Sequence, residues 1–517
     1  MAVEMRKELA DALDRALAAS DRGIVRSADL RRGDRERLVG NGYLGEVFKG
    51  WYFLTKPTDS AGETTAWYAT FWGFLTVYLR ELYQDAYCLS AVSSLDVHLG
   101  RTTVPEQVIA MVAKGGNRHQ ALPCDTSVLI YKTPQAELTQ AVEVDGLRVM
   151  PLPLALVRLP ATYFVQRPVD AEIAFCSLRG TADLCRALMA KSGRAAAGRI
   201  MGAYQFLGQT RRADEISDVL RAAGISVDAE SPFRTQQPVL SGEEPVSPYA
   251  ARISATFRGM RGDVLSVFGD EHSATIPDAD AYLTRVNDIY QYDAYNSLSI
   301  EGYRVTPQLI QRIRDGSWDP DHNPDDQREV GAFAAKGYLE AFKLVRSCIG
   351  RVLAGEDVVD LLSAEYPKWY QALFSATVAA GILEPYHLAG FRNGPVLIKG
   401  SRHVPPPAHA VTDSMDALLA VLRQEESTAV RAVLGHFLFG FIHPYMDGNG
   451  RMARFFMNML LAAGGCPWTI IRVSRRSGYM SALERASCEG EIRPFAELVL
   501  EEMNVDWTEE ANQLRPT

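Results

Sequence analysis

Several side chains that could do chemistry together lie within one stretch of twelve residues, 443–454. His443 has a side chain whose pKa lies near neutrality, so it can take a proton from an incoming hydroxyl group. Asp447 offers the hard oxygen ligand that Mg2+ prefers. Arg451 and Arg454 are three residues apart, so on a helix they share a face and both can bind phosphate oxygens. These residue types at this spacing indicate a polyphosphate site with a base beside it.

The backbone of the same stretch also suits an anion. Gly448, Asn449 and Gly450 allow the chain to approach a ligand closely and to turn its N–H groups inward. A helix that begins at about Gly450 would place its positive end at the same spot. We therefore expect nucleotide phosphates to be bound by Gly448, Asn449, Gly450, Arg451 and Arg454. No Walker-type Gly-Lys-Ser/Thr loop occurs near them in the sequence.

Two apolar segments must position this stretch. Residues 429–442 precede it, residues 455–463 follow it, and both are rich in helix-forming residues. They predict two buried helices, while Pro444 and the glycines interrupt the pattern between them. The prediction is a helix, a tight polar loop and a second helix. The alternative is a glycine-rich turn between two core helices, with His443 as a hydrogen-bonded core histidine.

The full stretch, His443-Pro-Tyr-Met-Asp-Gly-Asn-Gly-Arg-Met-Ala-Arg454, resembles the signature of the Fic family, His-x-Phe-x-(Asp/Glu)-Gly-Asn-Gly-Arg-x-x-Arg. Tyr445 stands where the family usually has Phe, which keeps an aromatic ring there. The resemblance covers most of residues 250–510 and implies a mainly α-helical core. It also implies a protein adenylyltransferase, which moves AMP from ATP to a Ser, Thr or Tyr hydroxyl of a protein target, the chain itself included.

The resemblance further assigns a role to each residue of the loop. It implies that His443 is the catalytic base and that Asp447 holds Mg2+ against the α- and β-phosphates. Asn449 and Arg451 would bind the same phosphates, and Arg454 would bind the γ-phosphate. Gly450 stands where phosphorylating members of the family carry Lys, which favours transfer of AMP over transfer of phosphate. ATP and Mg2+ are therefore the expected cofactors.

A second motif lies ahead of this core. Ser297-x-x-x-Glu301-Gly302 is similar to the inhibitory helix motif of one class of Fic proteins. That resemblance implies that Glu301 pairs with Arg454 and occupies the guanidinium group needed for the γ-phosphate. The alternative is a helix end capped by Gly302, with Glu301 in solvent. A rival function is that Glu301 positions water to remove AMP, as a deAMPylase would.

A hairpin is predicted between the two motifs. Val396, Leu397 and Ile398 form one expected strand and residues 402–404 the other. The pair resembles the flap with which Fic proteins hold a target segment by strand addition. The alternative is an ordinary surface hairpin, and His403 is interpreted as a surface residue.

Residues 1–60 predict three short helices, over 5–18, 27–30 and 34–42, followed by a hairpin around Lys49-Gly50. Helices followed by a wing indicate a winged helix-turn-helix, and the stretch loosely resembles the N-terminal domain of abortive-infection antitoxins. The basic residues that could meet a DNA backbone are Arg31, Arg32, Arg35, Arg37 and Lys49. Acidic residues among them leave a solvated face or a protein-docking surface as alternatives. A DNA-binding transcriptional regulator with a Fic module is thus the hypothesis from another class.

Between these parts, residues 61–226 predict a mixed α/β accessory domain, with strands over 126–131 and 147–150 and helices over 182–191 and 195–220. Its aromatic cluster is interpreted as core, and His98 and His119 as structural or surface residues. Residues 227–249 are rich in Pro, Ser and charge, which is typical of a linker. The Fic domain is expected over residues 250–510.

The composition sets the broad class. With 517 residues, a net charge of -9 and 47% hydrophobic residues, the chain is typical of a soluble multidomain protein and is not polybasic. Seven cysteines without a Cys-x-x-Cys pair predict reduced thiols in a cytosol, not a disulfide framework or a zinc site. The polar N-terminus does not match a signal peptide and the apolar windows are too short for a bilayer. We expect a cytoplasmic protein without a membrane partner, and leave open whether it is a homo-oligomer.

Overall fold

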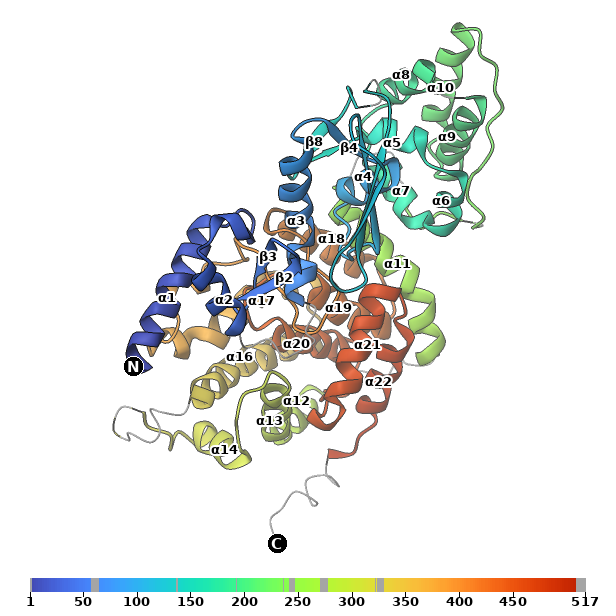
Figure 1. Cartoon of the computed structure of the whole chain (residues 1–517). Coiled ribbons are helices and arrows are strands. Elements are labelled where there is room, and N and C mark those ends of the chain that lie inside the picture. Colours follow the sequence, from blue (N-terminus) through green and yellow to red (C-terminus); the bar gives the residue numbers. More distant parts are fainter. Residues whose placement is uncertain are drawn as a thin grey trace. The chain divides into compact units, whose positions relative to one another are not determined.

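The computed structural model of the chain describes residues 2–56, 65–135, 138–191, 193–235, 237–240, 247–269, 278–320, 322 and 330–507. The chain folds into two units, whose elements are labelled in Figure 1. The first unit is Met1–Ala251 with Leu397–Val404, and the second is Arg252–Val396 with Pro405–Thr517. The finer division into segments 1–60, 61–226, 227–249 and 250–510 stays a prediction. Among the described helices, none is long and apolar enough to cross a membrane.

The first unit begins with two helices and a small sheet. Its elements in order are α1 (Ala2–Ala19), β1 (Ile24–Arg26), η1 (Ser27–Asp29), α2 (Arg32–Gly40), β2 (Leu44–Phe48) and β3 (Trp51–Leu54). The strands form an antiparallel sheet in the order β1-β3-β2. Gly50 joins β2 to β3 at a φ of 94°, a conformation that favours glycine. The three predicted helices and the hairpin are therefore present, the second helix as a 3-10 turn, whereas the winged-helix interpretation stays a prediction.

The rest of the first unit mixes strands and helices, as expected. Its elements are α3 (Thr65–Tyr83), β4 (Tyr87–Leu89), α4 (Ala91–His98), β5 (Gln107–Val112), β6 (Arg118–Ala121), β7 (Ser127–Lys132), β8 (Val142–Val144), β9 (Leu147–Val149), α5 (Leu152–Arg158), α6 (Ala161–Gln166), α7 (Pro168–Cys176), α8 (Ala182–Lys191), α9 (Arg194–Phe206) and α10 (Thr210–Ala222). Four strands form a sheet in the order β4-β5-β7-β6, in which β5 and β7 are parallel. Trp67 and Phe71 are buried, so the aromatic cluster is core. Phe233, from segment 227–249, stacks on Phe206 with ring centroids 4.6 Å apart, so this part of the segment packs on α9.

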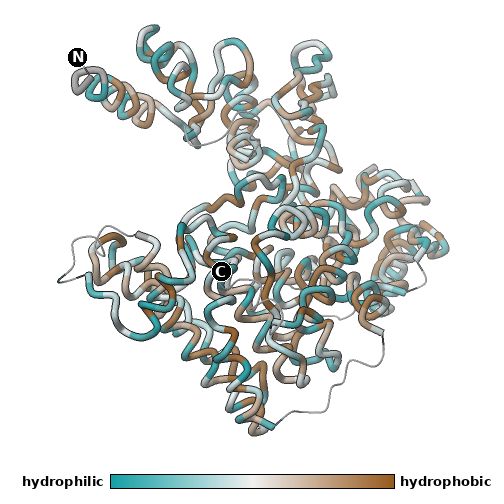
Figure 2. Tube along the Cα trace, turned by 90° about the horizontal axis from the view of Figure 1, so that it is seen from below, coloured by the Kyte–Doolittle hydropathy of each residue, from teal (hydrophilic) through white to brown (hydrophobic). Residues whose placement is uncertain are grey.

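The second unit is almost entirely helical. Its elements are most of α11 (Pro248–Phe268), α12 (Ala279–Asp288), α13 (Tyr290–Ile300), α14 (Pro307–Asp315), α16 (Val330–Leu353), α17 (Val358–Ala379), η3 (Pro385–Leu388), η4 (Ala408–Ala410), α18 (Val411–Gln424), α19 (Thr428–Ile442), α20 (Asn449–Ala463), η5 (Val473–Arg475), α21 (Arg476–Glu489) and α22 (Arg493–Met503). Figure 2 shows hydrophobic and hydrophilic residues alternating along most helices of the chain, as expected when one face of each is buried.

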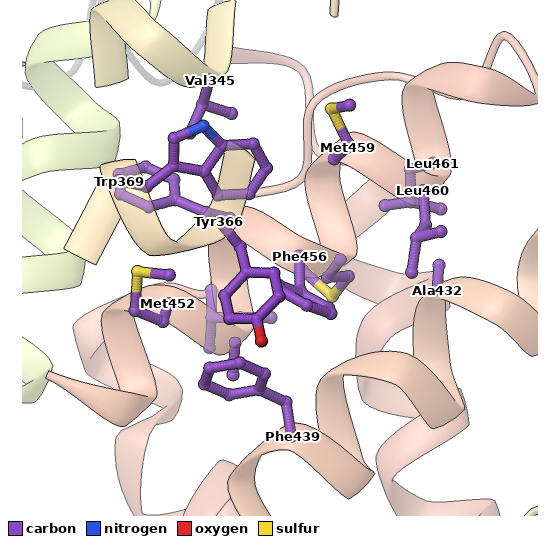
Figure 3. Packing of buried hydrophobic residues seen from close by; sticks show 14 of the residues in the cluster. Val345, Tyr366, Trp369, Ala432, Phe439, Met452, Phe456, Met459, Leu460 and Leu461 are labelled. Carbon is purple, nitrogen blue, oxygen red and sulfur yellow. The ribbon is translucent and has the colours of Figure 1, made fainter. Parts of the chain in front are cut away.

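Helix α20 lies at the centre of the second unit, in contact with α16, α17 and α19. Every residue from Arg451 to Ala462 is buried, as expected for a helix that other helices surround on all sides. The rings of Phe439 on α19 and Phe456 on α20 have centroids 4.7 Å apart, and Figure 3 shows Trp369 of α17 in the same cluster. Rigid packing of this kind holds the ends of α19 and α20, where the candidate loop lies, in one place.

The predicted hairpin at residues 396–404 is wrong. The structure has no strand over these residues, and His403 instead forms an isolated antiparallel bridge with Thr103. Within the first unit, Val404 N donates to Thr102 O at 2.7 Å and Gly400 N donates to Thr65 Oγ1 at 2.9 Å. The backbone N–H groups of Gly400 and Val404 therefore pair with residues far away in the sequence. His403 is only 2% exposed, so its interpretation as a surface residue is also wrong.

Candidate active site

The loop between α19 and α20 is defined by two left-handed residues. His443 ends α19 with φ 52° and ψ 59°, and Gly448 precedes α20 with φ 81°. A Cβ on Gly448 would lie 2.8 Å from the Phe374 ring, so this position needs glycine for space as well as for conformation. The predicted helix, tight loop and second helix are confirmed.

The Asn449 side chain folds the loop back on itself. Its Oδ1 accepts from Tyr445 N at 3.0 Å, and its Nδ2 donates to Tyr445 O at 2.8 Å. Both polar ends of this buried amide are thus engaged with backbone. The phosphate contact expected for Asn449 stays a prediction, and its backbone N–H at the start of α20 is a further donor suited to an anion.

Tyr445, the departure from the expected Phe, anchors the loop in the core. Its ring stacks on Tyr370 of α17 with centroids 3.7 Å apart and planes 6° apart. Burial raises the pKa of the Tyr445 hydroxyl, which stays protonated. The Tyr445 ring therefore packs as a Phe ring would, and its hydroxyl stays neutral.

Arg392 holds the loop from the other side, a role that the sequence analysis missed. Its Nε donates to His443 O at 2.8 Å, and its backbone N donates to Pro444 O at 2.9 Å. Its other guanidinium nitrogens donate to the carbonyls of Gly394, Pro406 and Ile442. These bonds satisfy carbonyl groups at the end of α19 that the helix itself leaves unpaired. Burial lowers the pKa of Arg392 to about 10, so it stays charged at neutral pH.

The His443 imidazole is neutral, and one of its ring nitrogens faces a backbone carbonyl group. Its Nδ1 lies 3.2 Å from Gly440 O, and since a carbonyl only accepts, Nδ1 carries the hydrogen. Nε2 then keeps its lone pair, as a base requires. Burial lowers the pKa of His443 to about 4, so the imidazole is unprotonated at neutral pH.

Arg454 is clamped by both polar residues of the second motif. Its Nη2 donates to Glu301 Oε1 at 2.7 Å and to Ser297 O at 3.0 Å, and its Nε donates to Ser297 Oγ at 2.9 Å. Ser297 and Glu301 lie one turn apart, so they face the same guanidinium. Gly302 follows at a φ of 88° and ends the helix. The expected Glu301–Arg454 pair is present, and the alternative of an unpaired Glu301 in solvent does not hold.

Charge and burial oppose each other at Glu301, whose side chain is 26% exposed. Burial on its own would raise the pKa of Glu301, but the charges of Arg454 and Arg451 outweigh it and hold that pKa below its usual value. The carboxylate is therefore ionised at neutral pH and offers a full negative charge to the buried Arg454 guanidinium.

Arg451 is 1% exposed and lies between two rings. Its guanidinium carbon is 5.0 Å from the centroid of Phe374 and 5.1 Å from that of Tyr303. Within the described residues, Arg451 Nε and Arg454 Nη1 are buried without a hydrogen-bond partner. Unpaired buried donors are costly, so two of them beside one loop indicate a site that an anionic ligand completes.

The Asp447 carboxylate is suited to bind a metal ion that substrate phosphates also coordinate. Its side chain is 66% exposed, and its Oδ1 accepts from Gly448 N at 2.6 Å. No cluster of three or more His, Cys, Asp or Glu side chains that could hold a metal occurs among the described residues. Mg2+ usually keeps several waters and takes one or two carboxylates plus substrate phosphates. One exposed carboxylate beside the candidate phosphate site fits that requirement.

Comparison with known proteins agrees with this geometry. Residues 364–461 match the model of the Fic/DOC family. The loop from His443 to Arg454 lies inside the matched residues. Protein adenylyltransferase Fic of Drosophila melanogaster is 35% identical over 233 residues, which are 44% of this chain and 43% of that protein. The Drosophila grimshawi protein of the same name is 29% identical over 233 residues, 44% of each.

These relatives share only part of their length with this chain, which spans under half of each. A solved structure of a Fic-1 fragment from C. elegans covers 67% of this chain and 98% of its own, at 18% identity and a TM-score of 0.37. That structural likeness is too weak to bear on function.

Proposed function

We propose that the second unit is a protein adenylyltransferase that moves AMP from ATP to a Ser, Thr or Tyr hydroxyl of a protein, and that Glu301 restrains it. One observation carries the proposal. A neutral imidazole and two buried guanidinium groups with unused N–H donors converge on one loop. That set suits a nucleotide polyphosphate with a base beside it. The names of the relatives support the same activity.

The chemistry follows from these groups. Nε2 of His443 takes the proton of the target hydroxyl as its oxygen attacks the α-phosphorus of ATP. The new O–P bond forms as the bond to the β-phosphate oxygen breaks, and pyrophosphate leaves. Arg451 and the N–H groups at the start of α20 stabilise the charge on the phosphates. Mg2+ on Asp447, with ATP phosphates and water, supplies further positive charge when bound.

Glu301 restrains the reaction through Arg454. Their ion pair uses the guanidinium group that would bind the γ-phosphate. The Glu301 carboxylate also stands over Gly450, because a Cβ there would lie 2.3 Å from Glu301 Oε1. A γ-phosphate brought to this place would meet a like charge. ATP could then bind only in a pose that is unsuited to in-line attack.

Transfer of the labelled α-phosphate tests the proposal. We expect Glu301→Gly to raise auto-AMPylation from ATP labelled at the α-phosphate, with no label incorporated from the γ-phosphate. Intact mass should increase by one AMP, and His443→Ala in the same background should abolish the increase. Label arriving from the γ-position would identify phosphate transfer instead, and no label from either position would remove the enzymatic proposal.

Removal of AMP is the second candidate, because Glu301 keeps part of its side chain exposed beside the loop. A carboxylate there could position a water molecule for attack on an AMP-modified target. A target modified beforehand by the Glu301→Gly variant separates the two activities. If unmodified chain removes the AMP and the Glu301→Gly variant does not, removal is the principal reaction.

DNA binding by residues 1–60 draws less support from the geometry. Arg32 pairs with Glu36 at 2.7 Å, and Arg37 pairs with Glu8 at 2.7 Å. Basic residues already paired with acids gain less from DNA phosphates. A gel shift of the full chain against random and self-promoter DNA tests this hypothesis. None of the seven cysteines, all of which the structure describes, forms a disulfide, which fits the cytoplasm that we propose as the compartment.

A further inference from the structure

Helix α13, which carries Glu301 at its end, has a second buried anchor. Asp293 Oδ2 accepts from Tyr338 OH at 2.6 Å, and its Oδ1 accepts from Trp468 Nε1 at 3.0 Å. Burial raises the pKa of Asp293 to about 6. The indole N–H of Trp468 therefore helps to hold α13 in position. Trp468 lies just after α20, the helix that begins at the candidate loop.

More contacts tie α13 to the C-terminal part of the chain. Tyr292 stacks on Trp507, with ring centroids 5.8 Å apart and planes 30° apart. Asn296 Oδ1 accepts from Val473 N at 2.8 Å, and Ile300 O accepts from Arg476 Nε at 2.7 Å. Helix α13 is thus held along its length by residues that follow α20, and not only by Arg454.

Two of the residues that anchor α13, Trp468 and Trp507, also line a cavity. The cavity has a volume of about 570 Å3, lies wholly within the second unit and includes no residue of the 443–454 loop. Its lining is mostly apolar. The residues that decide its chemistry are Tyr282, Arg285, Asp288, Trp468, Asp506 and Trp507.

We propose that this cavity is an effector site for a small planar heteroaromatic molecule that is neutral or positively charged, and that its occupant holds α13 in the inhibited position. The size is that of a small-molecule site. Three aromatic rings offer faces for stacking and for a cation. The charged residues of the lining are one arginine and two aspartates, so the rim disfavours anions. The regulatory half of this proposal rests on the proposed function.

The direction of the effect follows from linkage. The cavity is present while Glu301 is paired with Arg454. An occupant that touches Trp468 and Trp507 adds contacts to the arrangement that holds α13 docked. A ligand favours the state in which it makes more contacts. The occupant therefore strengthens the inhibition by Glu301. In a variant that lacks Glu301, the occupant should have no effect on AMP transfer.

Binding is tested by fluorine NMR of the full chain labelled with 5-fluorotryptophan. Trp468→Phe and Trp507→Phe assign the two resonances. Indole, tryptamine and indole-3-acetate share one ring system and differ in charge. We expect indole and tryptamine to shift the Trp468 and Trp507 resonances while Trp318 stays unchanged, and indole-3-acetate to bind more weakly. Absence of a shift at both tryptophans, or tighter binding of the anion, overturns the proposed site.

Coupling is tested by label transfer. Saturating tryptamine should lower auto-AMPylation of the unmodified chain at least about fivefold, the lower end of typical coupling between sites, and leave Glu301→Gly unaffected. Equal inhibition of both would place tryptamine at the ATP site and overturn the coupling. If Glu301→Gly shows no AMPylation at all, the proposed function fails, while the NMR result still decides whether the cavity binds.

The anchor is tested without any ligand. Trp468→Phe keeps an aromatic ring and removes the N–H donor to Asp293, and should raise auto-AMPylation at least about fivefold. Trp318→Phe is the matched control, because Trp318 is buried in the same unit and its Nε1 has no partner among the described residues. Equal activity of Trp468→Phe and the unmodified chain, at equal melting temperature, contradicts the anchoring role.

Discussion

Glu301 and Gly450 are matched to each other: a Cβ on Gly450 would lie 2.3 Å from Glu301 Oε1. The carboxylate thus rests directly on the first turn of α20, where the helix N-terminus attracts negative charge. In the proposed function, a phosphate of ATP would be attracted to the same place for the same reason. In the proposed function, the glycine that would admit the nucleotide therefore also admits the carboxylate that opposes it.

Gly450→Ala should destabilise the chain only while Glu301 is present. We expect a loss of about 1–3 kcal/mol in the free energy of unfolding, because the methyl group overpacks the carboxylate. In a Glu301→Gly background the loss should fall below about 1 kcal/mol, since alanine is also the better helix former. A double-mutant cycle by urea denaturation measures the difference. Additive effects would show that the two residues do not touch.

Arg392→Ala should lower both stability and activity. It leaves the carbonyl oxygens of His443, Ile442 and Pro406 without their donor, and we expect a loss of about 3 kcal/mol or more. In the Glu301→Gly background, AMP transfer should fall strongly because the end of α19 is no longer held. Arg423→Ala, which breaks an exposed pair with Asp360, is the control and should cost under about 1 kcal/mol. Equal effects of the two variants would contradict the role of Arg392.

The pH dependence of AMP transfer should report the low pKa of His443. In the Glu301→Gly variant, the acid limb of kcat/KM should be centred at or below about pH 4 and not near the usual value of about 6.5. The pKa in the folded protein lies below that in the unfolded chain. Stability should therefore also fall as the pH drops from about 6.5 toward the folded-state pKa. An acid limb near pH 6.5 would show that the imidazole is well solvated.

Tyr445→Phe should be nearly silent. The ring and its stacking on Tyr370 remain, so we expect a change under about 1 kcal/mol in the free energy of unfolding and unchanged AMP transfer. Tyr445→Ala removes the ring and should cost about 3–5 kcal/mol. Thermal melts and label transfer in the Glu301→Gly background measure both. A large loss of transfer in Tyr445→Phe, at unchanged stability, would instead give the hydroxyl a part in the reaction.

The local elements of the candidate site could be predicted from the sequence. Two apolar segments separated by Pro444 and glycines predict helix, loop and helix, because propensity and turn formation act between near neighbours. The spacing of Ser297 and Glu301 likewise places both side chains on one face of a helix, since residues four apart are neighbours there. For these features the chain needs no distant partner.

Only the tertiary structure decided which groups remain free to bind a ligand. Arg392 lies 51 residues before His443, yet it holds the backbone of the loop. The Asn449 side chain is hydrogen-bonded to the backbone of Tyr445. Residues 397–404 belong to the first unit, where they pair with Thr65, Thr102 and Thr103 instead of forming a hairpin. Hydrogen bonds between residues far apart in the chain leave no periodic signal in the sequence. They form because buried polar groups must be paired, and folding decides which partners are within reach.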